Sequence, residues 1–128
     1  MIDKEKKYLA IDWGEKRLGL AVGQLEPNLA VPLKTVANLS EVLAVIIEEE
    51  VDEIVLGQPI SMSGKENFSD NFLYFKKLLT EKANIPIHLV DERLSSKAAD
   101  KLLISKKLGV RDELAAMVIL ETFLNLND

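Results

Sequence analysis

The sequence contains no cysteine and only one histidine, which removes several kinds of functional site. Without cysteine, the chain can form neither a disulfide framework nor a thiolate metal site. The single histidine, His88, lies between Ile87 and Leu89 in an apolar run, where a packed or surface side chain is expected rather than a catalytic base. No Ser-His-Asp or Cys-His arrangement is therefore expected.

Long hydrophobic runs are also missing. No apolar stretch approaches the roughly 20 residues that span a bilayer, and the run after the charged start is too short for a signal-peptide core. These absences predict a cytoplasmic protein without membrane contact. The 128 residues, 48% hydrophobic and 29% charged, predict one globular domain over residues 1–128, as a monomer or a weak homodimer.

The charges are distributed unevenly along the chain. The net charge of −5 argues weakly against nucleic-acid binding, because phosphate contacts require Lys and Arg. Residues 40–53 carry six acids and no base, whereas residues 91–111 carry six bases and three acids. The basic segment therefore offers a local route to phosphate binding that the total charge hides.

Hydrophobic periodicity predicts a mixed α/β fold. Three strands are expected near residues 7–13, 17–22 and 33–36, then a helix from Ser40, a strand over 53–56, a helix from about 68 to 84, a strand over 87–90, a helix from Ser95 or Ser96 to about 105, and a last helix over 111–124. Alternating helices and strands pair in parallel through right-handed crossovers. The expected fold is a mixed five-stranded sheet, antiparallel then parallel, flanked by helices.

Acidic residues stand where this fold would gather them. Asp12 ends the first apolar strand, Asp91 and Glu92 end the last, and Asp112 opens the last helix. Sites form beyond the carboxyl ends of parallel strands, and strand alternation allows only one of Asp91 and Glu92 to share the face of Asp12. Hard oxygen ligands suit Mg²⁺ or Mn²⁺, and two such ions can drive phosphodiester hydrolysis.

Each acid also has a purely structural explanation. Asp12 precedes Gly14 and could form a turn, Asp91 and Glu92 could be a charged strand end, and Asp112 could complement the helix macrodipole. The neighbouring Glu113 would serve the macrodipole equally well. Only Asp112, however, shares a helical stripe with the small residues Ala115 and Ala116, which lets it face the sheet.

Five basic residues are candidates for nucleic-acid contacts. They are Lys16 and Arg17 in the first hairpin, Arg93 directly after Glu92, and Lys97 and Lys101, spaced i and i+4 in the helix after Ser95. These side chains could position phosphates without reading bases. The alternative is a solvated helix face.

Four segments carry a resemblance to a known family. Leu9–Val22, Val55–Pro59, Val90–Ser96 and Asp112–Ala116 are similar, in the same order, to motifs of the YqgF (RuvX-like) family. The resemblance implies an RNase H-like fold and either Holliday-junction resolvase activity or a nuclease that trims the 5′ end of pre-16S ribosomal RNA. It also implies that Asp12, Glu92 and Asp112 are the catalytic acids that bind Mg²⁺ or Mn²⁺.

The function expected is a metal-dependent endonuclease. RNA is the preferred substrate, because an acidic chain lacks a broad basic face, and a DNA junction is also possible. One alternative is a non-catalytic nucleic-acid-binding module with the same fold that acts in ribosome assembly or transcription. Another is an ATP-binding member of the actin-like superfamily, suggested by Asp12-Trp13-Gly14, but those proteins need two such domains and this chain has room for one.

Overall fold

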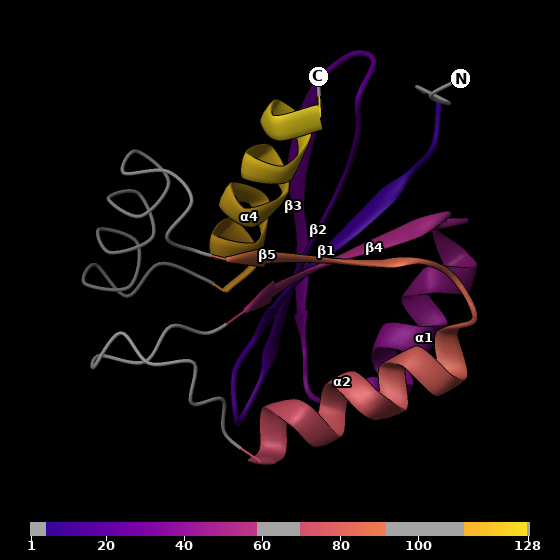
Figure 1. Ribbon diagram of the computed structural model, residues 1–128, viewed down its shortest axis with the longest axis vertical. Coiled ribbons are helices and arrows are strands. Elements are labelled where there is room, and N and C mark those ends of the chain that lie inside the picture. The colour runs from indigo at the N-terminus through magenta and orange to yellow at the C-terminus, as the bar shows by residue number, and fades with distance from the viewer. Residues whose placement is uncertain (1–4, 59–69, 92–111, 128) are drawn as a thin grey trace.

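The chain folds around a five-stranded sheet (Figure 1). A computed structural model describes residues 5–58, 70–91 and 112–127. Within these ranges the elements are β1 (Tyr8–Trp13), β2 (Leu18–Gln24), β3 (Leu29–Val36), α1 (Leu39–Glu48), β4 (Glu53–Gln58), α2 (Asp70–Ala83), β5 (Ile87–Asp91) and α4 (Asp112–Asn127). No helix in the described ranges is long and apolar enough to cross a membrane.

The strand order is β3-β2-β1-β4-β5. The first three strands pair antiparallel, whereas β4 pairs parallel to β1 and β5 pairs parallel to β4. This arrangement confirms the mixed sheet predicted from the alternation of helices and strands. It places the ends of β1, β4 and β5 at the same edge of the sheet.

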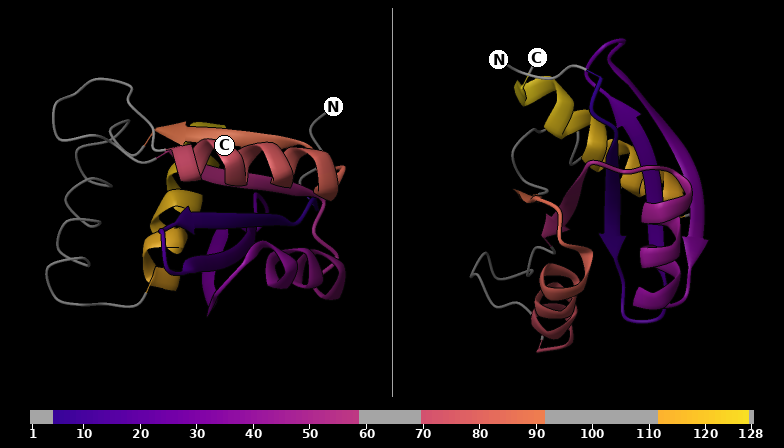
Figure 2. Two further views of the ribbon diagram at one scale, coloured as in Figure 1. Left: turned by 90° about the horizontal axis from the view of Figure 1, so that it is seen from below. Right: turned by 90° about the vertical axis from the view of Figure 1, so that its right-hand side faces the viewer.

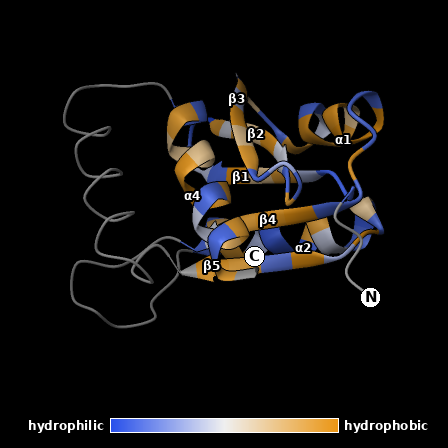
Figure 3. Ribbon diagram, turned by 90° about the horizontal axis from the view of Figure 1, so that it is seen from above, coloured by the Kyte–Doolittle hydropathy of each residue, from blue (hydrophilic) through white to orange (hydrophobic). Residues whose placement is uncertain are grey.

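The two faces of the sheet are covered by different helices (Figures 1 and 2). Leu9 and Ile11 of β1 pack in one core with α1 and α2, while Tyr8 and Ala10 pack in a second core with α4. Figure 3 shows hydrophobic residues along β4 and a mixture of hydrophobic and hydrophilic residues along the helices. Because strand side chains alternate, Asp12 belongs to the α4 face of β1.

Helix α4 lies close to the sheet because its inward residues are small or meet glycine. Ala115 and Ala116 are buried, as the predicted stripe requires. A Cβ added at Gly57 would stand 2.5 Å from Cδ1 of Ile119, so the isoleucine occupies the space that a β4 side chain would fill. Close packing of α4 therefore fixes where its first residue, Asp112, meets the sheet.

Strand β3 is longer than predicted, because the sequence pattern predicts a loop at Pro32. It begins at Leu29 and includes Pro32, which pairs with Ala21. An edge strand needs a hydrogen-bond ladder on one side only, so it can accommodate a residue without an N–H. The register also shifts between Leu20 and Ala21, which leaves Leu33 as an extra residue opposite them.

Helix α1 begins one residue before the predicted start because Asn38 caps it. The Asn38 side chain accepts a 3.0 Å hydrogen bond from the Glu41 N–H, and a Glu41 carboxylate oxygen accepts one of 2.6 Å from the Ala37 N–H. This reciprocal pair satisfies two backbone donors at the helix start. At the end of α2, Asn84 adopts a φ of 60°, which agrees with the predicted stop at that residue.

A buried carboxylate on β4 joins the starts of β1, β4 and β5. Glu53 of β4 is 7% exposed, and its oxygens lie 2.6 Å from Lys6 Nζ and 2.5 Å from His88 Nε2. The His88 ring also stacks against Phe123 of α4, with ring centroids 4.9 Å apart. His88, on β5, thus has a packing role near the start of β1, whereas Asp12 lies near the other end of that strand. Its place in an apolar run predicted such a role.

These contacts set the pKa of Glu53. Burial alone would raise it, but hydrogen bonds and charge interactions with Lys6 and His88 outweigh burial and lower the pKa below its ordinary value. A carboxyl with a depressed folded-state pKa stabilises the fold above its unfolded pKa of about 4.3, and this stabilisation is lost as the pH falls through the folded pKa.

We expect Glu53→Gln to lower the free energy of unfolding by about 1–3 kcal/mol at pH 7, because hydrogen bonds to a charged group are lost. The difference from wild type should shrink as the pH falls through the lowered pKa of Glu53, where the carboxyl itself becomes protonated. Urea denaturation over a series of pH values from 7 downward measures this. Glu48→Gln on the exposed side of α1 is the control and should change stability by less than about 0.5 kcal/mol. Equal losses in the two variants would contradict a stabilising role for Glu53.

Candidate functional site

Asp12 is an acid in an otherwise apolar part of the sheet. It is 9% exposed and stands opposite Gly19 in the β1–β2 ladder. Gly19 in turn stands opposite Thr35 of β3, so the three residues form one row across three strands. Cross-strand partners point to the same face of a sheet, so this row belongs to the face covered by α4.

The absence of a side chain at Gly19 leaves room for Asp112, the first residue of α4, to lie above this row. A Cβ added to Gly19 would stand 2.1 Å from the Asp112 carbonyl oxygen and 2.7 Å from the Asp112 Cβ. The helix start therefore occupies the volume in which any larger side chain at position 19 would lie. Asp112 and Asp12 both border Gly19 on one face, so the fold brings together two of the three predicted acids.

Arg17 completes the described part of the site. Its Nε lies 3.0 Å from Oδ2 of Asp112, and the two side chains are 70% and 35% exposed. The hairpin that carries Arg17 is tight, since a Cβ on Gly14 would lie 2.8 Å from the Arg17 carbonyl oxygen. Lys16 is exposed in the same hairpin. Of the two basic residues predicted in the hairpin, Arg17 therefore contacts the start of α4, and Lys16 is its neighbour in the sequence.

Glu113, the neighbour of Asp112, is held by a different strand. Thr35 Oγ1 donates a hydrogen bond of 2.5 Å to Glu113 Oε2. This contact holds Glu113 toward β3, whereas Arg17 contacts Asp112. The two adjacent acids at the start of α4 thus have separate partners.

The remaining predicted site residues are Glu92, Arg93, Lys97 and Lys101, which all lie outside the described residues. On β5, Val90 is buried in the core that α4 covers, and the strand pairs with β4 as far as Gln58 and Asp91. Among the described residues, no group of three or more His, Asp or Glu side chains could hold a metal ion. Asp12 and Asp112 supply only hard oxygen donors, which suit a divalent cation such as Mg²⁺ or Mn²⁺.

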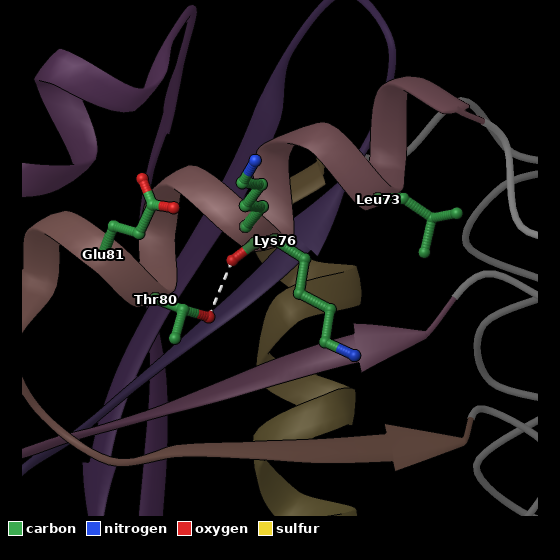
Figure 4. Close-up of a pocket in the computed structure, with 5 residues that line it drawn as sticks. Leu73, Lys76, Thr80 and Glu81 are labelled. Carbon is green, nitrogen blue, oxygen red and sulfur yellow. Dashed lines mark hydrogen bonds between the residues drawn. The ribbon is translucent and has the colours of Figure 1, made fainter.

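A shallow depression along α2 is separate from this site (Figure 4). It is lined by Leu73, Lys76, Lys77, Thr80 and Glu81, and Thr80 Oγ1 donates a 2.8 Å hydrogen bond to the Lys76 carbonyl oxygen. Helix α2 belongs to the core on the sheet face opposite α4. The depression therefore contains none of the predicted catalytic acids and takes no part in the candidate site.

Two sequence comparisons agree on one family. The model of the RuvX family, described as Holliday junction resolvase, matches residues 6–126. A protein of Maridesulfovibrio salexigens, provisionally named a pre-16S rRNA nuclease, is 40% identical over 131 residues, covering 92% of this chain and 97% of the relative. A Rickettsia felis protein with the same name is 38% identical over 132 residues, covering 91% and 84%.

Solved structures share the fold at much lower identity. Thermus thermophilus RuvC superposes with a TM-score of 0.60 at 15% identity and covers 94% of this chain and 95% of its own. The fowlpox virus Holliday junction resolvase gives a TM-score of 0.54 at 14% identity, with 95% and 99% covered. These likenesses establish the RNase H-like fold predicted for the chain.

We expect Gly19→Ala to lower the free energy of unfolding by about 1–3 kcal/mol, because the added methyl group would overlap backbone atoms of Asp112 that cannot move without the helix. Thermal and urea denaturation measure the loss. Gly57→Ala is the comparison and should cost less, because its methyl group would meet side-chain atoms of Ile119, with Cδ1 nearest, rather than backbone atoms. Similar stability of the two variants would show that α4 does not rest on Gly19.

Proposed function

This chain belongs to the RuvX family of Holliday junction resolvases, and we propose that it hydrolyses phosphodiester bonds in structured RNA with divalent ions held by Asp12, Glu92 and Asp112. The family and the curated relatives make the chain a nuclease. The observation that carries the assignment of the acids is the placement of Asp12 beside Gly19 in the ladder and of Asp112 over Gly19 on the same face of the sheet.

Glu92 is proposed as the third acid from strand alternation. The core covered by α4 contains Val90 of β5, and Glu92 follows it by two positions in the sequence. Period-2 alternation would give Glu92 the same facing as Val90 and hence the side of the sheet on which Asp12 lies. Three carboxylates would then surround the position where the scissile phosphate must sit.

The roles of the residues follow from their chemistry. When bound, divalent ions would supply an activated nucleophile at neutral pH and charge stabilisation of the leaving oxygen. Asp12, which is more buried than Asp112, would anchor the ions, and Asp112 and Glu92 would complete the ligand set. Arg17, Lys16 and Arg93 would bind phosphates next to the acids. Lys97 and Lys101 would bind further phosphates along the nucleic-acid strand.

RNA is proposed over DNA for two reasons. The relatives with 38–40% identity carry the name of a pre-16S rRNA nuclease, although the family model is described as Holliday junction resolvase. The net charge of −5 also disfavours a wide contact with duplex arms, whose binding depends on many phosphate contacts. A 5′-extended precursor of 16S ribosomal RNA is therefore the first substrate to test, with a four-way DNA junction beside it.

Cleavage by purified protein should require Mg²⁺ or Mn²⁺ and stop in EDTA. Asp12→Asn should reduce the rate by more than about 100-fold, since losing even a residue that supports a metal ligand costs 10- to 100-fold. Gel assays on the precursor RNA and on the junction, run in parallel, measure both effects. Glu81→Gln on α2 is the control and should cleave like wild type.

The non-catalytic alternative predicts a different pattern in the same assays. Wild type would bind RNA yet cleave neither substrate with either ion, and Asp12→Asn would bind as wild type does. That result would contradict the nuclease site proposed above and favour a binding role in ribosome assembly.

The basic pair Lys97 and Lys101 yields a separate prediction. Replacing both with Gln should weaken binding to all sequences alike and flatten the dependence of log affinity on log salt by up to ~2 units on duplex DNA, and less on single strands. Fluorescence anisotropy across a salt series, on Asp12→Asn protein to prevent cleavage, measures the slope. An unchanged slope would remove these two lysines from the binding surface.

A further inference from the structure

Arg17 contacts the same carboxylate that the proposed site assigns to a metal ion. Its Nε lies 3.0 Å from Asp112 Oδ2, within hydrogen-bond range of one oxygen. Asp112 borders Gly19, and Gly19 is the ladder partner of Asp12. The guanidinium therefore lies at the edge of the proposed metal site, on a ligand oxygen.

The hairpin that carries Arg17 is anchored by packing, while the Arg17 side chain is mostly exposed. Trp13 and Leu18 close the hairpin as paired residues, and the Trp13 ring packs on Phe72 of α2 with centroids 5.6 Å apart. The Arg17 side chain, in contrast, is 70% exposed. An exposed ion pair of this kind is weak, so a stronger competitor for Asp112 can displace it.

We propose that Arg17 exchanges partners during the catalytic cycle: it neutralises Asp112 before the metal binds and moves to a substrate phosphate once the metal holds Asp112. This inference rests on the proposed function. A divalent ion would both compete for the carboxylate oxygen and repel the guanidinium. A phosphate offers Arg17 a bidentate partner of higher charge next to the site.

Such an exchange couples metal binding to substrate binding. Metal that releases Arg17 makes it available to the phosphate, and by reciprocity bound nucleic acid, by drawing Arg17 away, favours the metal. Arg17 would thus bind and position the substrate phosphate only when the metal is present. Lys16, its neighbour in the hairpin, has no ion-pair partner among the described residues and should not share this role.

Calorimetric titration of Mn²⁺ into the protein without nucleic acid tests whether Arg17 competes with the metal for Asp112. Arg17→Gln should bind Mn²⁺ about two- to fivefold more tightly than wild type, because the competitor for Asp112 is gone. Lys16→Gln removes the same charge from the same hairpin and should have a smaller effect. Arg17→Gln affinity equal to that of wild type, or a gain no larger than that of Lys16→Gln, would overturn the proposal.

Binding and cleavage of RNA test whether Arg17 moves to a substrate phosphate once the metal holds Asp112. In EDTA, Arg17→Gln should bind a labelled precursor RNA almost as well as wild type, because Arg17 is occupied by Asp112. In Mn²⁺, the same variant should raise KM several-fold while kcat stays near that of wild type, since the metal ligands are intact. Equal weakening of binding in EDTA and Mn²⁺ would mean that Arg17 contacts phosphate regardless of the metal and would overturn the exchange.

The two proposals fail in different ways. If wild type binds no Mn²⁺ in the titration, the metal site itself is wrong, and the exchange falls with it. If wild type binds Mn²⁺ and Asp112→Asn weakens that binding, but Arg17→Gln leaves it unchanged, only the exchange is wrong. Circular dichroism of each variant shows whether the exposed hairpin substitutions leave the fold intact.

Discussion

The position of α4 over the sheet is the constraint on which the site depends. Two glycines make this position possible: Gly57 receives the Ile119 side chain, and Gly19 receives the helix start itself. Among the described residues, the approach of the helix at Gly19 brings Asp112 to the face of the sheet on which Asp12 lies. This pair of acids therefore arises from packing between distant parts of the chain.

The separation of the two cores supports this arrangement. The core that includes α1 and α2 packs against one face and contains Trp13 and Phe72, while the core under α4 contains Ala116 and Ile119. The hairpin carrying Arg17 is anchored in the first core through Trp13, whereas Asp112 is positioned through the second. The ion pair between Arg17 and Asp112 thus joins elements that are stabilised independently.

Much of this structure could be predicted from the sequence, and the exceptions have physical reasons. Period-2 and period-3.6 patterns predicted the strands, the last helix and the face of the sheet that Asp12 and Asp112 share, because these patterns depend on local alternation. The start of β3 was missed since Pro32 excludes a central strand but not an edge strand, and strand order is not a local property. Gly19 was given no role, although a glycine inside a strand signals a close approach. The Glu53 cluster with Lys6 and His88 was missed because it depends on contacts between residues distant in sequence.

The free edge at β3 has a consequence for how copies of this protein can associate. Exposed sheet edges invite other chains to add a strand, and proline and bulges are common means of preventing it. Pro32 and the register shift beside it both interrupt the regular pattern of β3 that a second strand would need to follow. Association by continuing the sheet is thereby discouraged along β3, which disfavours fibrillar aggregation through this strand.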